Sequence, residues 1–266
     1  MLATACPQRT RHPESIMRIL VFQHIACEHP GIFRDFLKSD GIAWDAVELD
    51  EGQPIPPLDR YDALWVMGGP MDVWQTDQHP WLVPEKAAIR QAVLGRRLPY
   101  LGMCLGHQLL ADALDGACKL MAKPEIGVLG IETTKEAHRD ALFRGLPAKA
   151  KALQWHSVEV TKLPANATVL ARSPDCAVEA MRVGDQAWGI QYHVEITAET
   201  VPQWGCVPEY AKALADRLGA DALPKMEAEA KRELPAMTLA ARRLYDNFMA
   251  VARSHKAARG AGRAAQ

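Results

Sequence analysis

The sequence lacks any apolar run long enough to span a membrane, so we expect no membrane association. It also lacks an excess of either charge, since the formal net charge is −1, and this argues against a nucleic-acid partner. Its six cysteines show no disulfide-framework spacing, so we expect reduced thiols and a cytoplasmic location. Residues 1–16 have no apolar core of a secretory signal and are predicted to be a disordered extension.

What the sequence does contain is enough apolar surface for one sizeable core, with 48% of its 266 residues hydrophobic. Up to residue 114, short apolar runs alternate with segments of helical periodicity, which is typical of βαβ units. The expected strands are 18–25, 44–49, 61–67 and 99–103. We therefore predict a three-layer α/β/α fold with a flavodoxin-like, mostly parallel sheet.

The pattern changes after residue 114. Short runs of β-type residues, separated by turn signals, predict a small antiparallel insertion that returns to the main sheet at 187–192. The expected strands of the insertion are 118–121, 128–133, 152–160, 168–172 and 178–183. Residues 17–200 are thus predicted to form one domain.

The remaining chain is rich in alanine, glutamate and arginine. We predict that residues 201–255 form helices packed on the domain, and that residues 256–266 form a flexible tail. Four prolines are expected to cut the helical region into pieces, namely Pro202, Pro208, Pro224 and Pro235.

The strongest chemical signal is the segment from Leu101 to Gln108, which reads as strand, sharp turn and helix. Gly102 and Gly106 lie two residues on either side of Cys104, as in a nucleophile elbow. The N-terminus of a helix at such a turn favours a thiolate over a thiol. The alternative is a buried cysteine that acts as a small hydrophobic residue, and this pattern alone leaves both open.

A second chemical segment ends the strand expected at 187–192. Because alternate side chains of an extended chain share a face, Glu195 can orient the imidazole of His193 towards a thiolate. The glycines of Gly68-Gly69-Pro70, at the end of the third expected strand, allow the backbone to approach a ligand closely.

Two histidines and a cysteine follow the first expected strand. The spacing of His24, Cys27 and His29 matches no common zinc arrangement, so we predict a loop and no metal site.

Taken together, Gly68-Gly69-Pro70, the segment Gly102 to Gln108 and the segment Gln191 to Glu195 resemble the class I glutamine amidotransferases in order and spacing. The resemblance covers roughly residues 18–197 and is greatest to free-standing relatives of the GMP synthase amidotransferase domain. Two positions depart from the family pattern. Val194 replaces a frequent proline, and Trp155 is aromatic where some relatives have small or polar residues.

The resemblance implies a Cys-His-Glu triad, with Cys104 as the nucleophile, His193 as the general base and acid, and Glu195 as the orienting carboxylate. It implies an oxyanion hole formed by the backbone N–H groups of Gly69 and Leu105. It also implies a set of substrate-binding residues, namely Gly68, Gln108, His156 and Ser157.

The implied activity is hydrolysis of the γ-glutamyl amide of glutamine through a thioester, with no cofactor. The alternatives are a γ-glutamyl peptidase acting on glutathione-like compounds, and a non-catalytic binding or regulatory module. A related family of stress-response proteins also has an elbow cysteine, but its supporting acid typically comes from an earlier part of the chain. In α/β-hydrolases the acid likewise precedes the histidine, whereas here it follows.

A partner is also implied. Residues 198–266 are too few and too helical for an ammonia-accepting domain. We therefore expect that the possible acceptor of ammonia is a separate synthase subunit.

Overall fold

The computed structural model describes residues 17–264, and the predicted extension at 1–16 lies outside the described residues. The strands are β1 (Arg18–Gln23), β2 (Ala43–Glu48), β3 (Ala63–Val66), β4 (Tyr100–Met103), β5 (Ala117–Thr133), β6 (Lys149–Lys162), β7 (Ala167–Arg172), β8 (Ala180–Val183) and β9 (Ala187–Ile190). The α-helices are α1 (Phe33–Asp40), α2 (Leu82–Arg90), α3 (Leu105–Ala113), α4 (Thr200–Trp204), α5 (Pro208–Leu218) and α6 (Ala222–Ala264). None of the helices within 17–264 combines the length and the apolar character needed to cross a bilayer.

In the described part of the chain, the strands form one nine-stranded sheet in the order β2-β1-β3-β4-β9-β8-β7-β5-β6. The first five of these pair in parallel, in the order typical of flavodoxin-like sheets. The other strands pair antiparallel and extend the same sheet. The predicted α/β architecture with an antiparallel insertion is therefore confirmed.

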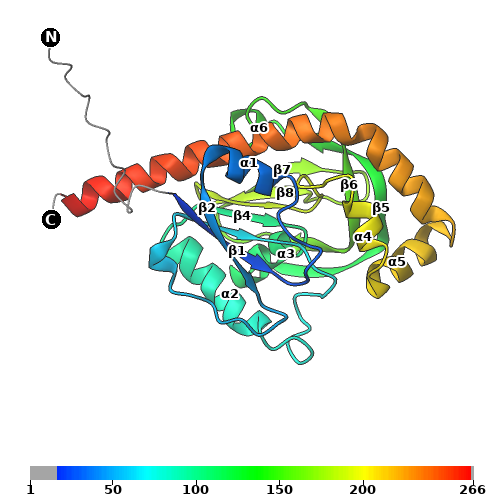
Figure 1. The fold of residues 1–266 in the computed structure, drawn as a ribbon, viewed down its shortest axis with the longest axis horizontal. Coiled ribbons are helices and arrows are strands. Elements are labelled where there is room, and N and C mark those ends of the chain that lie inside the picture. The colour runs from blue at the N-terminus through cyan, green and yellow to red at the C-terminus, as the bar shows by residue number, and fades with distance from the viewer. Residues whose placement is uncertain (1–16, 265–266) are drawn as a thin grey trace, which may run out of the picture.

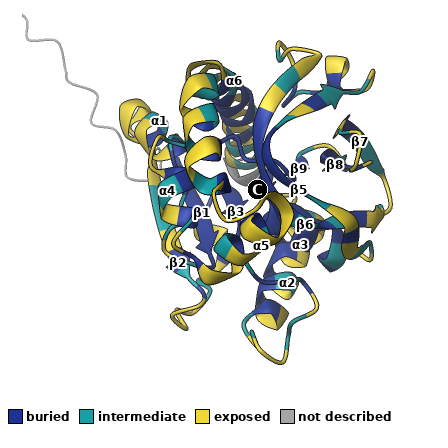
Figure 2. Ribbon diagram, turned by 90° about the vertical axis from the view of Figure 1, so that its right-hand side faces the viewer, coloured by how far each residue is buried: buried dark blue, intermediate teal, exposed yellow. Residues whose placement is uncertain are grey.

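Side chains along β1 alternate between two helical layers, as the pleat requires. Ile19 and Val21 pack in a core with α1 and α6, whereas Leu20 and Phe22 pack with α2 and α3. Figure 1 shows α6 along one side of the sheet and α2 on the other, and Figure 2 shows the central strands as buried. Because both faces are covered, the parallel strands read in the sequence as nearly continuous apolar runs.

The antiparallel half differs from prediction at one point. The strands expected at 118–121 and 128–133 are one continuous strand, β5, of 17 residues. Its register with β6 shifts between Leu120 and Glu125, and this irregularity accommodates the polar residues that interrupt the apolar alternation. That interruption is why the sequence pattern predicts a turn there.

The C-terminal region is divided into α4, α5 and α6, but only two of the four prolines, Pro208 and Pro224, lie where a new helix begins, and Pro202 lies inside α4. Pro208 and Pro224 lie in the first turns of α5 and α6, where a missing N–H removes no helical hydrogen bond. Pro235 lies inside α6, so the cut expected there is wrong. The helix also continues to Ala264, through most of the segment predicted as a flexible tail at 256–266.

The packing of α6 explains why the helix tolerates an interior proline, which costs about 3 kcal/mol. Tyr245 and Phe248 are fully buried in the core on that side of the sheet, where both rings contact Trp65. Burial of one large side chain contributes about 1.5–3 kcal/mol, so a few such contacts offset the proline.

Candidate functional site

Cys104 lies at the turn between β4 and α3, at the carboxyl edge of the parallel strands. Its φ of 48° is unfavourable for a residue with a side chain and is typical of a strained elbow. Its N–H donates to Ile190 O over 2.8 Å, which fixes the turn to the end of β9. Because α3 begins at the next residue, the N-terminal end of its dipole lies beside the sulfur.

Gly102 and Gly106 are required here by close backbone contacts. A Cβ at Gly102 would lie 2.4 Å from Gly106 O, and a Cβ at Gly106 would lie 2.1 Å from Val66 O. The start of α3 therefore packs directly on β3 and β4, and it holds Cys104 at a fixed position above the sheet.

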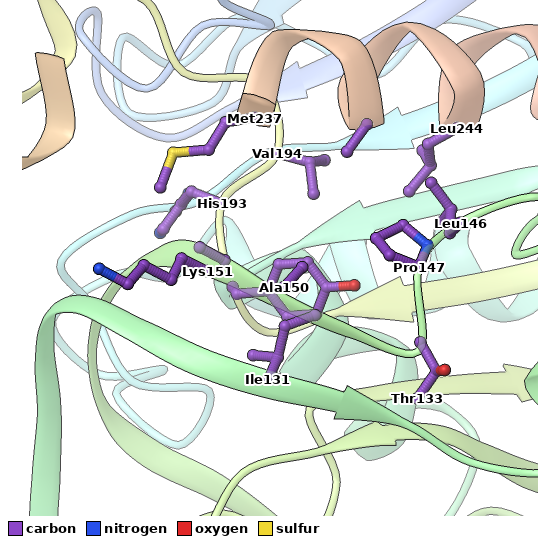
Figure 3. A pocket seen from close by; sticks show the side chains of 13 residues that line it. Ile131, Thr133, Leu146, Pro147, Ala150, Lys151, His193, Val194, Met237 and Leu244 are labelled. Carbon is purple, nitrogen blue, oxygen red and sulfur yellow. The ribbon is translucent and has the colours of Figure 1, made fainter. Parts of the chain in front are cut away.

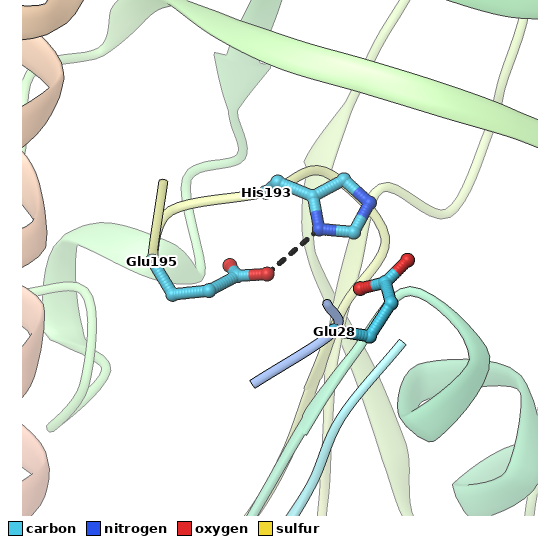
Figure 4. A group of neighbouring side chains, drawn as sticks. All are labelled: Glu28, His193 and Glu195. Atoms are coloured by element: carbon cyan, nitrogen blue, oxygen red, sulfur yellow. Dashed lines mark hydrogen bonds and ion pairs between the residues drawn. The ribbon is translucent and has the colours of Figure 1, made fainter. Parts of the chain in front are cut away.

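His193 follows β9 and reaches the same edge of the sheet. Its Nδ1 lies 2.8 Å from Glu195 Oε1, as the dashed line in Figure 4 marks. The backbone N–H of His193 donates to Leu153 O over 2.9 Å, and the N–H of Val194 donates to Glu195 Oε2 over 2.9 Å. Both members of the pair are thus fixed by backbone hydrogen bonds as well as by each other.

The surroundings of His193 favour its charged form. Burial alone lowers the pKa of His193, but the Glu195 carboxylate and the Cys104 sulfur outweigh it and raise the pKa well above its ordinary value. Its Nε2 is buried and has no hydrogen-bond partner among the described residues. The Trp204 ring meets the imidazole edge-on at a centroid distance of 4.4 Å. An imidazolium with an available Nε2 next to a thiol is the arrangement that stabilises a thiolate.

The two predicted oxyanion donors are neighbours. A Cβ at Gly69 would lie 3.1 Å from Leu105 Cδ2, so the two residues approach each other closely. Within residues 17–264, the turn and loop hydrogen bonds include none donated by the N–H of Gly69 or Leu105. Gly68 lies behind them with its carbonyl oxygen 2.8 Å from His24 Nδ1, and it does not line the pocket at Cys104. Direct contact of Gly68 with a substrate is therefore not supported by the geometry.

A pocket of about 470 Å³ opens at Cys104. Its lining includes three residues predicted to bind substrate, Gln108, His156 and Ser157. Gln108 donates through Nε2 to Gln191 Oε1 over 3.1 Å, and Gln191 Nε2 lies 3.5 Å from Cys104 Sγ. Asp72 and Glu209 add two carboxylates, and the described lining residues include no lysine or arginine. Asp72 and Glu209 therefore make part of the pocket wall acidic.

His156 has a polar partner near each ring nitrogen. Nδ1 lies 3.0 Å from Val158 O, and Nε2 lies 3.3 Å from Glu125 Oε2 and 3.8 Å from Glu179 Oε1. Burial lowers the pKa of His156, but the two carboxylates outweigh it and raise the pKa to about 10. Ser173 also donates to Glu125 over 2.6 Å. The two carboxylates therefore hold His156 in its charged form, and its Nε2 faces them as an ion pair without a hydrogen bond.

A second pocket, of about 450 Å³, lies beside residues 192–194, between the β5–β6 hairpin and α6 (Figure 3). Its walls are mostly apolar and include Ile131, Ala150, Met237 and Leu244. His193 borders it but Cys104 does not, so the pocket that contains Cys104 is the candidate site.

Two groups of buried side chains lie close enough together to be considered for metal binding, namely Glu28 with His193 and Glu195, and Glu125 with His156 and Glu179. In each group a histidine nitrogen already faces a carboxylate as a hydrogen-bond or ion-pair partner. The arrangement therefore fits oriented histidines better than metal ligands.

The residues His24, Cys27 and His29 do not converge. His24 Nε2 lies 2.8 Å from Glu85 Oε1, whereas His29 Nδ1 accepts the N–H of Gly31 over 3.1 Å.

Four residues at the site were not predicted from the sequence, namely Glu28, Gln191, Trp204 and Tyr210. Gln191 precedes His193 by two, so the strand alternation could have placed it on the same face. Glu28 follows the first strand, at the edge where open α/β sheets bind ligands, which is a weak signal. Trp204 and Tyr210 come from the C-terminal helices, and no local motif marks them.

Comparisons with known proteins identify the family of the chain. The model of the class-I glutamine amidotransferase family matches residues 37–202, more than half of the chain. The glutamine amidotransferase-like protein YfeJ of Salmonella typhimurium is 32% identical over 208 residues, which cover 76% of this chain and 85% of that protein. One subunit of the glutamine-hydrolyzing GMP synthase of Sulfolobus acidocaldarius is 31% identical over 156 residues, or 58% of this chain and 78% of that relative.

Solved structures give the same result. A glutamine amidotransferase from Thermotoga maritima has a TM-score of 0.78 at 26% identity and covers 87% of this chain and 97% of its own. A second, from Methylobacillus flagellatus, has a TM-score of 0.76 at 27% identity and covers 88% of this chain and 95% of its own. By its matched residues and its fold, the protein belongs to the class I glutamine amidotransferase family.

Proposed function

We propose that the protein hydrolyses the γ-glutamyl amide of glutamine to glutamate and ammonia, with Cys104, His193 and Glu195 as its triad. The observation that carries the proposal is the strained Cys104 at the start of α3, beside an imidazole with an available Nε2 backed by Glu195. Backbone strain of this kind costs on the order of 1–3 kcal/mol. A binding module needs neither the strain nor the oriented imidazole, which argues against the non-catalytic alternative.

In the first half of the reaction, the Cys104 thiolate attacks the γ-carbonyl carbon of glutamine. The developing oxyanion accepts hydrogen bonds from the N–H groups of Gly69 and Leu105, and each such donor lowers the barrier by about 3 kcal/mol. The protonated Nε2 of His193 gives its proton to the leaving nitrogen. The C–N bond breaks, ammonia leaves, and a γ-glutamyl thioester remains on Cys104.

In the second half, neutral His193 takes a proton from water as the water oxygen attacks the thioester carbon. The same backbone donors serve the second oxyanion. The C–S bond breaks, glutamate leaves, and the thiolate and imidazolium pair is restored. Glu195 keeps Nε2 directed at the reacting atoms in both halves.

The shape of the pocket supports a γ-glutamyl peptidase as the second candidate. The pocket extends from Cys104 to Glu209 and Ala213 on α5, which leaves room for a substituent on the amide nitrogen. The carboxylates of Asp72 and Glu209 favour a neutral or cationic substituent over an anionic one. Cysteinylglycine, the substituent in glutathione, ends in a carboxylate, so we expect glutathione to be hydrolysed more slowly than a γ-glutamyl amide with an uncharged substituent.

A partner belongs to the proposal as well. The Sulfolobus relative is named as one subunit of a GMP synthase. By analogy, we propose that ammonia from this chain serves a separate synthase subunit. If the purified chain releases ammonia, hydrolysis itself needs no partner.

The test is to measure ammonia released from glutamine, and cysteinylglycine released from glutathione, by the purified full chain. Cys104→Ala is the inactive variant, and Cys206→Ala, at an exposed cysteine, is the matched control. We expect Cys104→Ala to abolish release and Cys206→Ala to leave it unchanged. Release that persists in Cys104→Ala would overturn the assignment of the nucleophile.

A further inference from the structure

A carboxylate outside the proposed triad lies next to His193. Glu28, in the loop after β1, is 1% exposed, although buried glutamates are rare. One ligand atom each from Glu28, His193 and Glu195 lies within 4.8 Å of the others. Figure 4 shows the Glu28 carboxylate on one side of the imidazole and Glu195 on the other. The reaction steps described above give Glu28 no role.

Neighbouring residues hold the Glu28 side chain in position. Tyr210 donates its hydroxyl hydrogen to Glu28 Oε1. A Cβ at Gly68 would lie 2.4 Å from Glu28 Oε2, so a glycine is needed there to admit the carboxylate. Among the described residues Oε2 has no hydrogen-bond partner, although it is buried. A buried carboxylate oxygen without a donor is costly unless a positive charge lies near it, and His193 can supply that charge.

The C-terminal helices hold this loop at two points. Tyr210, on α5, binds Glu28 itself, and Trp204, on α4, donates through Nε1 to Cys27 O over 3.2 Å. The Trp204 ring also packs edge-on against His193. The segment from α4 to α5 therefore contacts both the carboxylate and the imidazole.

We infer that Glu28 is a positioning residue that keeps the His193 imidazolium protonated, and that Tyr210 holds Glu28 in place for this task. The inference rests on the proposed function of His193 as the acid that protonates ammonia. A second carboxylate near the ring favours the charged imidazolium without occupying Nε2, which stays directed at the reacting atoms. The helices at 200–218 then complete the active site and are more than a cover for the sheet.

The groups that face Glu28 affect its pKa and therefore the pH range in which it carries a charge. They are His193, Glu195, His24 and Tyr210. Burial raises the pKa of Glu28 to about 6, against the lowering effects of His193 and Tyr210. Glu28 is therefore mostly ionised at neutral pH, and its effect on His193 fades as the pH falls through about 6.

The experiment is an NMR titration of His193 in the full chain with ¹⁵N-labelled histidine, assigned through His193→Gln. Glu28→Gln keeps the shape and removes the charge, and we expect the pKa of His193 to fall by about one unit or more. Tyr210→Phe leaves Glu28 without its donor, so Glu28 binds a proton more readily and the pKa of His193 falls by a smaller amount. Tyr245→Phe is the matched control, since it removes a tyrosine bond to Asp40 in the core cluster of α1 and α6, which does not include Tyr210.

An unchanged His193 titration in Glu28→Gln would overturn the inference and leave Glu28 with a structural role only. If Glu28→Gln does not fold, Tyr210→Phe decides, and a titration equal to that of Tyr245→Phe overturns the inference. The titration needs no substrate, so its result is independent of whether the protein hydrolyses glutamine. A shifted pKa in a protein that releases no ammonia would support the role of Glu28 and reject the proposed activity.

Discussion

Two buried histidines lie near Cys104, and different groups surround their imidazole rings. His193 has Nδ1 on Glu195 and leaves Nε2 without a partner among the described residues. His156 has Nδ1 at Val158 O and Nε2 between Glu125 and Glu179. A histidine that moves protons needs one nitrogen directed at the reacting atoms, whereas a histidine whose Nε2 faces two buried carboxylates acts as a fixed charge. The same residue type therefore serves two purposes. The group near the imidazole distinguishes them, since His193 interacts with the Cys104 sulfur and His156 with two carboxylates.

The largest expected effect is on activity at His193. His193→Gln should lower the rate of glutamine hydrolysis by about 10³–10⁴-fold, because the variant can neither accept nor donate the proton. Its free energy of unfolding should also fall, because Glu28 and Glu195 stay buried without the imidazolium that faces them. Steady-state ammonia release and urea unfolding measure the two quantities. A variant that keeps most of its activity would contradict the role assigned to Nε2.

Glu195→Gln should have the next largest effect on activity, a loss of about 10²–10⁴-fold, because the imidazole loses the carboxylate that orients it and stabilises its charge. The pH dependence of the residual activity should also change, since His193 then binds its proton less tightly. Glu199→Gln, four residues along the chain and exposed, is a suitable control. Equal pH profiles for Glu195→Gln and the wild type would reject the pairing.

At His156 we expect the main effect on stability and no comparable loss of proton transfer. His156→Gln leaves Glu125 and Glu179 buried without a cation, and breaking such a cluster costs about 3–5 kcal/mol of unfolding free energy. Urea unfolding of the purified variant measures this cost, and His138→Gln, at an exposed histidine, is the control. A stable but inactive His156→Gln protein would make His156 a catalytic residue and remove the contrast with His193.

The pH dependence of the unfolding free energy tests the role of His156 as a fixed charge. The pKa of His156 is raised to about 10, so its contribution is complete below about pH 6.5 and is lost as the pH rises through about 10. The pKa of Glu125 is lowered to about 2, so its contribution is present above about pH 4.5 and is lost as the pH falls towards 2. Urea unfolding of the wild type should show both declines, and His156→Gln should flatten the alkaline one. Parallel curves for the two proteins would contradict the assignment.

The smallest effect is expected at Ser173, which donates to Glu125 over 2.6 Å. Ser173→Ala should cost about 1–2 kcal/mol of unfolding free energy, because one donor is lost while the ion pair with His156 remains. Glutamine hydrolysis should change little. A loss of activity comparable to that of His193→Gln would show that the His156 cluster takes part in the chemistry.

The sequence predicts the parallel half of the sheet well, because strands covered on both faces leave long apolar runs. It also identifies Cys104, His193 and Glu195 as candidate site residues, because the chemistry needs particular residue types at fixed local spacing. The antiparallel half is harder to predict, since a register shift inside β5 resembles a turn in the hydrophobic pattern of the sequence. The continuation of α6 past Pro235 is harder still to predict, because only the packing of the helix on the sheet accounts for it.

The convergence of Glu28, Tyr210 and His193 could not be read from the sequence. These residues are separated by up to 182 positions, and no local motif links them. The acidic surroundings of His156 pose the same problem, since Glu125 and Glu179 come from two different segments of the antiparallel half. Such clusters depend on tertiary contacts and become visible only when the strands are placed side by side.

The most direct test of the central claim is mass spectrometry of the full chain, mixed with glutamine and quenched in acid within the first turnover. We predict a γ-glutamyl adduct on the peptide that contains Cys104, absent from Cys104→Ala and more persistent in His193→Gln if any forms there. Ammonia release without an adduct on Cys104, under conditions in which a model thioester survives the quench, would contradict catalysis through this cysteine.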